Sequence, residues 1–287
     1  MSIEVLVVDD SPFYLKRLTR VLDGDENIKI VGTATNGLEA VRQAKKLHPD
    51  VITMDVEMPT LNGIEATKQI MDEHPTPILM FSALTQEGAA ATFDALEAGA
   101  LDFLPKNKES LHGGVLIDKI INLSKCRLSR ERRAARKAEV KPEPAVKEAK
   151  EGLDVKLVMI GCSTGGPVAL QRILPDFPKD LPVPIVVVQH MPENFTSAFA
   201  GRMDKLSKLT VQEAKNREIL KPGHVYITPG GFQLGIIASD RNIQAKVDRG
   251  DDTEMYKPSV DFAFTSAANT LNNNVLGVIL TGMGQDG

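Results

Sequence analysis

Short apolar runs alternate with amphipathic segments through the first part of the chain. The apolar runs are rich in Val, Ile and Leu and predict buried β-strands over residues 4–10, 28–35, 51–56, 77–83 and 101–106. The segments between them place Leu, Ile, Val and Ala at helical spacing and predict helices over residues 13–22, 37–47, 63–72 and 87–98. This alternation favours a doubly wound α/β domain with a five-stranded parallel sheet.

A charged segment rich in Lys, Arg and Glu follows this domain. It contains few large apolar residues, so it buries too little surface to offset the entropy lost on ordering. We therefore expect a linker over residues 123–153, between a first domain at 1–122 and a second at 154–287. For residues 125–138 the alternative is a basic, solvated extension of the last helix of the first domain.

Apolar runs return in the last part of the chain and predict a second α/β domain, also doubly wound. The strands are expected over residues 155–161, 183–190, 225–229, 232–238, 242–247 and 274–282. The helices are expected over residues 170–174, 194–206 and 260–271. The stretch 225–247 resembles a β-hairpin inserted into this domain.

Composition narrows the functional class. The chain has 42% hydrophobic and 25% charged residues, which excludes collagen-like, coiled-coil and wholly disordered proteins. The net charge of -4 means that the chain lacks the overall positive charge typical of nucleic-acid-binding proteins. Two cysteines are too few for a disulfide framework. No apolar run has the length of a membrane span. We expect a cytoplasmic protein without a nucleic-acid partner and without direct membrane insertion.

Polar residues end four strands of the first domain. Asp9 and Asp10 end the first strand, Asp55 the third, Ser82 the fourth and Lys106 the fifth. Because parallel strands end at one edge of the sheet, three carboxylates meet there and favour a hard divalent cation. A hydroxyl and an ammonium group at the same edge suit phosphoryl oxygens. A single Asp at a strand end is more often a helix cap, but five polar groups together are hard to explain that way.

With Met58-Pro59 and Asn62-Gly63 just after Asp55, residues 3–122 resemble the response-regulator receiver family. The resemblance implies that Asp55 accepts a phosphoryl group from a histidine kinase. It further implies phosphoryl contacts from Ser82 and Lys106, an aromatic switch at Phe103, and a Mg²⁺ site formed by Asp9 (through water), Asp10, Asp55 and the carbonyl of Glu57.

In the second domain, a strand runs into the turn Gly161-Cys162-Ser163-Thr164-Gly165-Gly166-Pro167, followed by a helical pattern. Gly-x-Ser-x-Gly between strand and helix is the arrangement of a nucleophile elbow, in which glycines permit a sharp turn that exposes the serine. A glycine-rich phosphate cradle at a helix N-terminus is the alternative, and this motif alone does not decide between them.

Residues at two further strand ends favour the nucleophile elbow over the phosphate cradle. His190 ends the strand that should lie beside the elbow strand, and Asp286 follows the last strand. Serine, histidine and aspartate at one sheet edge match the logic of a catalytic triad: the hydroxyl attacks, the imidazole takes its proton and the carboxylate orients the imidazole. Glycines flank Met283 and leave its N–H free to point at an oxyanion. Histidines 48, 74, 112 and 224 are interpreted as structural.

The second domain resembles the chemotaxis protein-glutamate methylesterase family (CheB). The similarity rests on GCSTGGP, VVQHMPENFTSAFAGRMD, KPGHVYITPGG, YKPSVDFAF and LTGMGQDG. It implies a triad of Ser163, His190 and Asp286, an oxyanion contact from Met283, and no cofactor at the esterase site. Substrate contacts are expected from Thr164, Thr196, Ser197 and Arg202. Cys162 is interpreted as a small buried hydrophobe. The family extends well beyond the aspartate, so we expect the C-terminal part of this domain to be missing.

The resemblance implies a phosphorylation-regulated hydrolase. It would remove methyl esters from glutamates, and deamidate glutamines, on the cytoplasmic domains of chemoreceptors. The unphosphorylated receiver would cover the active-site edge, and phosphorylation of Asp55 would loosen that contact. The alternative is a non-catalytic signalling adaptor that binds receptors. A DNA-binding transcription factor is disfavoured because nothing after residue 155 resembles a helix-turn-helix.

Overall fold

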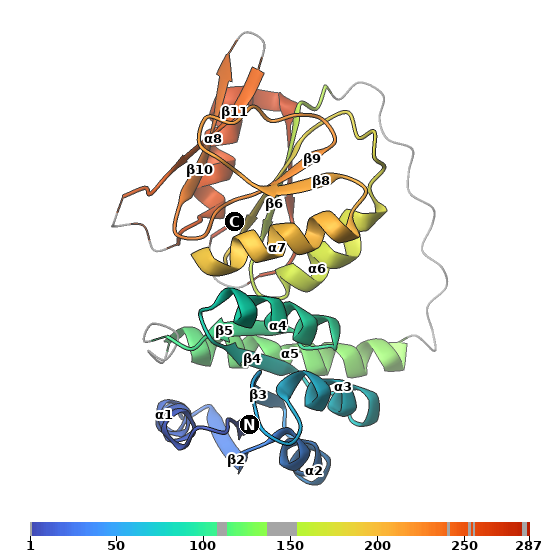
Figure 1. Ribbon diagram of the computed structural model, residues 1–287, viewed down its shortest axis with the longest axis vertical. Helices are drawn as coiled ribbons and strands as arrows, with labels where there is room; N and C mark the ends of the chain where they lie inside the picture. Colours follow the sequence, from blue (N-terminus) through green and yellow to red (C-terminus); the bar gives the residue numbers. More distant parts are fainter. Residues whose placement is uncertain are drawn as a thin grey trace. The chain divides into compact units, whose positions relative to one another are not determined.

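The structure is a computed structural model that describes residues 2–107, 114–136, 154–239, 242–251, 254, 256–282 and 286–287. It divides into two compact units, a first unit of Met1–Ala149 and a second unit of Lys150–Gly287. Each unit has its own parallel sheet (Figure 1). None of the helices in the described residues is both long and apolar enough to cross a membrane.

The sheet of the first unit has five parallel strands in the order β2-β1-β3-β4-β5. The strands are β1 Ile3–Val8, β2 Ile28–Ala34, β3 Val51–Asp55, β4 Ile78–Ser82 and β5 Asp102–Pro105. The central strands β3 and β4 are buried along their whole length, which explains their near-continuous apolar sequences. The expected five-stranded doubly wound sheet is confirmed.

Five helices cover the two faces of this sheet. They are α1 Pro12–Leu22, α2 Gly37–Leu47, α3 Gly63–Glu73, α4 Gln86–Glu97 and α5 Gly114–Arg136. α1 and α5 pack on one face in an apolar cluster that includes Leu18, Phe81 and Leu116. α2, α3 and α4 pack side by side on the other. α5 continues to Arg136, past the boundary expected at residue 122; residues 137–153 of the expected linker lie outside the described part.

The second unit has a five-stranded parallel sheet in the order β12-β6-β7-β9-β8. Its strands are β6 Leu157–Cys162, β7 Ile185–Gln189, β8 Thr210–Glu213, β9 His224–Ile227 and β12 Val275–Ile279. The helices are α6 Gly166–Ile173, α7 Glu193–Leu206 and α8 Val260–Leu271, with short 3-10 turns η1 Leu174–Asp176 and η2 Asn272–Asn274. α6 and α7 lie on one face of the sheet and α8 on the other (Figure 1).

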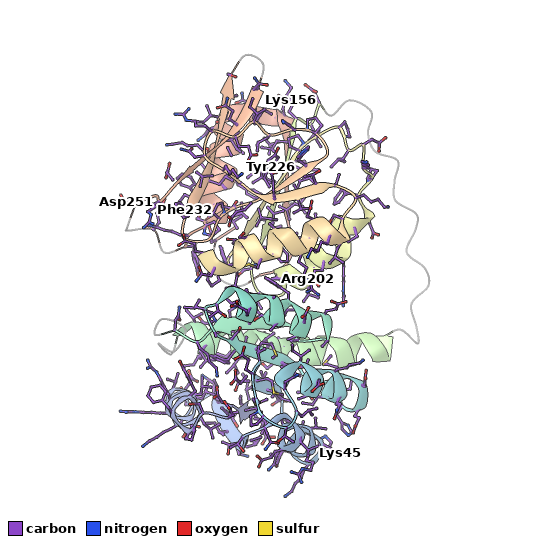
Figure 2. The ribbon with its side chains drawn as sticks, in the orientation of Figure 1. Lys45, Lys156, Arg202, Tyr226, Phe232 and Asp251 are labelled. Atoms are coloured by element: carbon purple, nitrogen blue, oxygen red, sulfur yellow. The ribbon has the colours of Figure 1, made fainter. Side chains whose placement is uncertain are left out.

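A hairpin of β10 (Gln233–Ser239) and β11 (Asn242–Asp248) packs over α8 and closes the apolar core of the second unit. Tyr226 of β9 is fully buried in this core, and its hydroxyl donates to the Ile219 carbonyl at 3.1 Å (Figure 2). The hairpin expected over 225–247 is thus correct for its two long strands. It is wrong for the first part of this stretch, which belongs to β9 and pairs in parallel with β7 and β8 inside the sheet.

The sequence pattern missed β8 altogether. Thr210–Glu213 is short and only partly apolar, as edge strands with one solvated side commonly are. The pattern also placed α6 too late, since this helix begins at Gly166 within the glycine-rich turn itself. Apolar periodicity cannot detect a first turn made of glycine and proline.

We predict that Asn36→Ala destabilises the first unit. The Asn36 side chain caps α2 by accepting a 2.9 Å hydrogen bond from the Glu39 N–H, and loss of such a cap costs about 1 kcal/mol. Urea unfolding followed by circular dichroism measures the change. Leu38→Ala on the same helix is the control, because this side chain is 46% exposed and its loss should change stability by less than about 0.5 kcal/mol. Equal losses in both variants would contradict the capping role.

Candidate functional sites

Ser163 follows β6 directly and lies in the turn that leads into α6. Gly165 in this turn has a φ of 76°, in the left-handed region that favours glycine. The Gly166 N–H donates to the Ser163 carbonyl at 2.8 Å and closes the turn. Ser163 is therefore presented, partly exposed, on a strand-to-helix elbow.

Gln189, the last residue of β7, links this elbow to the neighbouring strand. Its Nε2 donates to the Ser163 carbonyl at 2.9 Å and to the His190 carbonyl at 3.1 Å. Gly166 makes room for this side chain, because a Cβ there would lie 1.9 Å from the Gln189 Oε1. One buried carboxamide thus fixes the backbone of both residues.

His190 follows β7, which pairs with β6, so its ring lies beside the serine. The distance between His190 Nδ1 and Ser163 Oγ is 3.1 Å, and that between His190 Nε2 and Asp286 Oδ2 is 2.6 Å. The histidine and aspartate side chains are only 13% and 5% exposed. The structure thus brings together the three residues that the sequence singled out.

The Asp286 carboxylate lies at the N-terminus of α8. Its Oδ1 accepts hydrogen bonds from the Ser259 hydroxyl and the Asp261 N–H, both at 2.8 Å, and its Oδ2 accepts one from the Val260 N–H at 2.7 Å. Burial raises the pKa of Asp286, but these bonds and the contact with His190 outweigh it and hold the pKa below its ordinary value. The carboxylate is therefore ionised at neutral pH.

The charge of Asp286 decides the tautomer of His190. An ionised carboxylate only accepts hydrogen bonds, so the histidine Nε2 carries the proton and donates it. Nδ1 is then the free acceptor that faces the Ser163 hydroxyl. The arrangement can accept a proton from the serine at Nδ1.

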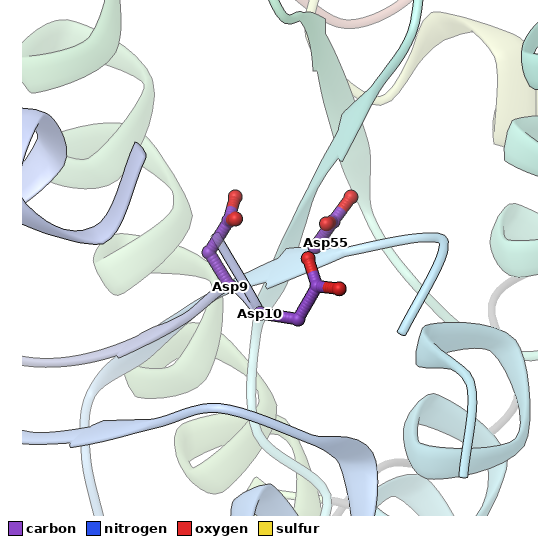
Figure 3. Close-up of side chains that lie close together, drawn as sticks. All are labelled: Asp9, Asp10 and Asp55. Atoms are coloured by element: carbon purple, nitrogen blue, oxygen red, sulfur yellow. The ribbon is translucent and has the colours of Figure 1, made fainter. Parts of the chain in front are cut away.

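Three carboxylates meet at the strand ends of the first unit. Asp9 and Asp10 follow β1, Asp55 ends β3, and one oxygen of each lies within 4.8 Å of the others (Figure 3). Asp10, Asp55 and Glu57 also line a cavity of about 600 Å³. An all-oxygen set of this charge has the chemistry that Mg²⁺ prefers.

Lys106 reaches into this cluster from the end of β5. Its Nζ lies 2.8 Å from Asp9 Oδ2, 2.6 Å from Asp55 Oδ2 and 4.6 Å from the centre of the Tyr14 ring. Burial raises the pKa of Asp55 to about 6, although the contacts with Lys106 lower it. Burial lowers the pKa of Lys106, but its bonds to Asp55 and Asp9 outweigh this and raise it.

Ser82 lies at the same edge but turns its hydroxyl elsewhere. Its Oγ donates to the Gly88 carbonyl in α4 at 2.9 Å. A phosphoryl contact from Ser82 therefore requires rotation of this hydroxyl away from α4. Phe103 is buried, and its ring packs edge-to-face against Phe93 of α4, with the two ring centres 6.2 Å apart.

Comparisons with known proteins identify the family of each unit. The family model of the response regulator receiver domain matches residues 5–113, and that of CheB methylesterase matches residues 158–287. The whole chain is 46% identical to protein-glutamate methylesterase/protein-glutamine glutaminase 4 of Hahella chejuensis, covering 86% of that protein. The chain belongs to the protein-glutamate methylesterase/protein-glutamine glutaminase family.

Further relatives and solved structures are similar to this chain. The protein-glutamate methylesterase/protein-glutamine glutaminase of Colwellia psychrerythraea is 44% identical over the whole chain, covering 85% of that relative. The crystal structure of the Thermotoga maritima CheB methylesterase catalytic domain is 49% identical, covering 46% of this chain and 70% of that one, with a TM-score of 0.45.

The remaining residues expected to contact substrate differ in exposure. Ser197 is exposed on α7, and Arg202 lies on the same helix, partly exposed (Figure 2). Thr164 is largely buried beside Ser163. Thr196 is fully buried; its hydroxyl donates to the Glu213 carboxylate at 2.6 Å and accepts from the Gly230 N–H, and its contact with substrate stays a prediction. Met283 lies outside the described residues.

Sequence reasoning missed the residues that support Ser163, His190 and Asp286. Gln189 and Ser259 were not singled out, although each lies within a segment that carries the family resemblance. Tyr256 was missed too; its ring stacks on His190. Cys162 was assigned correctly as a buried residue, and burial raises the pKa of its thiol well above its ordinary range.

We predict that Asp286→Asn lowers the free energy of unfolding of the second unit more at neutral pH than in acid. The lowered pKa of Asp286 stabilises the folded state above the ordinary value of 3.8, and this contribution is lost progressively as the pH falls from 3.8 through the lower pKa of the folded state. Loss of charged hydrogen bonds of this kind costs about 2 kcal/mol. Urea unfolding at pH 7 and pH 3 measures the difference.

The matched control is Asp180→Asn, which removes an exposed carboxylate from the same unit. It should change the free energy of unfolding by less than about 0.5 kcal/mol at either pH. A pH-independent loss in Asp286→Asn would show that the carboxylate charge does not stabilise the fold.

Proposed function

We propose that the second unit hydrolyses γ-glutamyl methyl esters and deamidates glutamines through a triad of Ser163, His190 and Asp286. The observation that supports this most is the continuous chain of hydrogen bonds from Ser163 Oγ through the imidazole to Asp286. The substrates are the methylated cytoplasmic domains of chemoreceptors, which places the reaction in the cytoplasm. The reaction serves adaptation in bacterial-type chemotaxis.

The first half of the reaction acylates the serine. The Ser163 oxygen attacks the ester carbonyl while its proton passes to His190 Nδ1, and a tetrahedral intermediate forms. The C–O bond to the methoxy group then breaks, and Nδ1 returns the proton so that methanol leaves. The γ-carboxyl carbon of the substrate is now esterified to Ser163.

The second half releases the product. Water attacks the acyl carbon, gives a proton to His190 Nδ1, and the Ser163 oxygen leaves with that proton. The substrate keeps a free carboxylate. With a glutamine substrate the same steps release ammonia in place of methanol, so one site performs both reactions.

Two charges form in these steps, the imidazolium at His190 and the oxyanion on the substrate, and each has its own stabilising group. The ionised Asp286 stabilises the imidazolium that forms at His190. The Met283 N–H is proposed to donate to the oxyanion. Thr164 is proposed to contact the triad and substrate from the turn, with Ser197 and Arg202 binding the receptor segment from α7.

We predict that Ser163→Ala abolishes reaction with a fluorophosphonate probe and slows methanol release from methylated receptors at least about 10³-fold, because triad members act as a unit. Gel fluorescence and methanol quantification measure the two effects. Ser239→Ala is the control, since it removes an exposed hydroxyl from the same unit and should still label. A wild-type chain that binds receptors but does not label would instead support the adaptor.

The first unit is proposed to regulate this activity by phosphorylation of Asp55. A chemotaxis histidine kinase supplies the phosphoryl group, and Lys106 and Ser82 contact its oxygens. The three carboxylates and the carbonyl of Glu57 fit Mg²⁺, which would neutralise charge on the transferring group. The partly buried Lys106 ammonium already contacts two of the carboxylates and would be released toward the phosphoryl oxygens.

We predict that Mg²⁺ affinity depends on pH through Asp55. Its pKa of about 6 means that a proton competes with the cation below this pH. Apparent affinity should rise about tenfold between pH 5 and pH 7 and level off above pH 7. Titration calorimetry with MgCl₂ measures it; Asp55→Asn should bind weakly with little pH dependence, and a pH-independent wild-type affinity would contradict the assignment.

A further inference from the structure

Tyr256 lies flat against His190. The centres of the two rings are 4.7 Å apart, and the angle between their planes is 5°. Tyr256 belongs to the segment that leads into α8, far from His190 in sequence. Stacking this close to parallel restricts how the imidazole can tilt.

The two hydrogen bonds of His190 leave this tilt unconstrained. Ser163 and Asp286 contact the imidazole at its two nitrogens, which are both on the edge of the ring. Contacts at two points of an edge still allow the ring to rock about the line that joins them. A flat aromatic surface against the ring face removes this remaining freedom.

Tyr256 is itself anchored to the support of Asp286. The carbonyl of Tyr256 accepts a 2.8 Å hydrogen bond from Gln233 Nε2, while Gln233 Oε1 accepts one of 2.8 Å from the Ser259 N–H. Gln233 is fully buried. One side chain thus fixes both the ring that stacks on His190 and the residue whose hydroxyl holds the Asp286 carboxylate.

We infer that Tyr256 is a positioning residue for His190: it sets the plane of the imidazole and stabilises the imidazolium through the face of its ring. This inference rests on the proposed function. A cation over an aromatic face is attracted by the ring quadrupole, whereas the neutral imidazole gains much less. Tyr256 therefore favours the charged state that forms when the serine proton is transferred.

Other titratable groups surround the ring. The Asp286 carboxylate contacts Nε2, and Asp261 of α8 donates its N–H to the same carboxylate. Cys162 ends β6 beneath His190, accepting the His190 N–H at its carbonyl, and its thiol stays protonated through burial. Glu193 at the start of α7 directs its carboxylate toward Gly231. Each of these is unchanged by substitution of Tyr256.

The test uses the full chain and a fluorophosphonate probe across pH 5 to 9, with wild type, Tyr256→Phe, Tyr256→Leu and Phe232→Leu. The measured quantities are the plateau labelling rate at Ser163 and the pH at which this rate falls to half on the acid side. Phe232→Leu is the matched control, because it removes another partly buried ring of the same unit that lies near Arg249. Thermal unfolding of every variant sets a measuring temperature at which all are folded.

We expect Tyr256→Leu to label about 2- to 5-fold more slowly and its half-rate point to move about 0.4 to 0.7 pH units toward acid. The sign follows because loss of the ring disfavours the imidazolium, so the base stays neutral to lower pH. Tyr256→Phe should restore rate and profile, since it keeps the ring. A loss of fold would lower the rate without moving the half-rate point.

An unmoved half-rate point in Tyr256→Leu, or an equal effect in Phe232→Leu, would overturn the inference. So would a Tyr256→Phe variant that behaves like Tyr256→Leu. These outcomes differ from failure of the proposed function, in which wild type itself does not label at Ser163. The comparison with Ser163→Ala separates the two.

Discussion

The Asp286 carboxylate accepts hydrogen bonds from the N-terminus of α8 and from His190 at once, and the geometry of the site in the second unit depends on this group. The N-terminus of a helix favours negative charge, because its first N–H groups lack partners within the helix. The same carboxylate orients the imidazole toward Ser163. Helix position and proton-accepting chemistry therefore depend on one another.

Both units use the edge at which parallel strands end, but for different chemistry. In the first unit this edge gathers like charges, and Lys106 balances them where burial would otherwise make the carboxylates costly to ionise. In the second unit it gathers one acid, one base and one hydroxyl, each partly satisfied by its neighbour. A parallel sheet supplies the geometry in each case, and the side chains decide its use.

Two buried carboxamides support Ser163, His190 and Asp286 from behind. Gln189 fixes the backbone of Ser163 and His190, while Gln233 connects Tyr256 with Ser259. A carboxamide can donate and accept at once, so each of these side chains joins two segments that are distant in sequence. Such a framework limits small displacements of reacting atoms, to which catalysis is sensitive.

The sequence by itself determined the two α/β folds, the acidic edge, and Ser163, His190 and Asp286, because apolar periodicity and strand-end residues are local signals. It missed β8 and misplaced β9 in the hairpin. Strand order, burial and side-chain partners depend on contacts between distant segments, which no local pattern contains. Only the tertiary structure therefore decided that Ser82 turns toward α4, that α8 holds Asp286 and that Tyr256 covers His190.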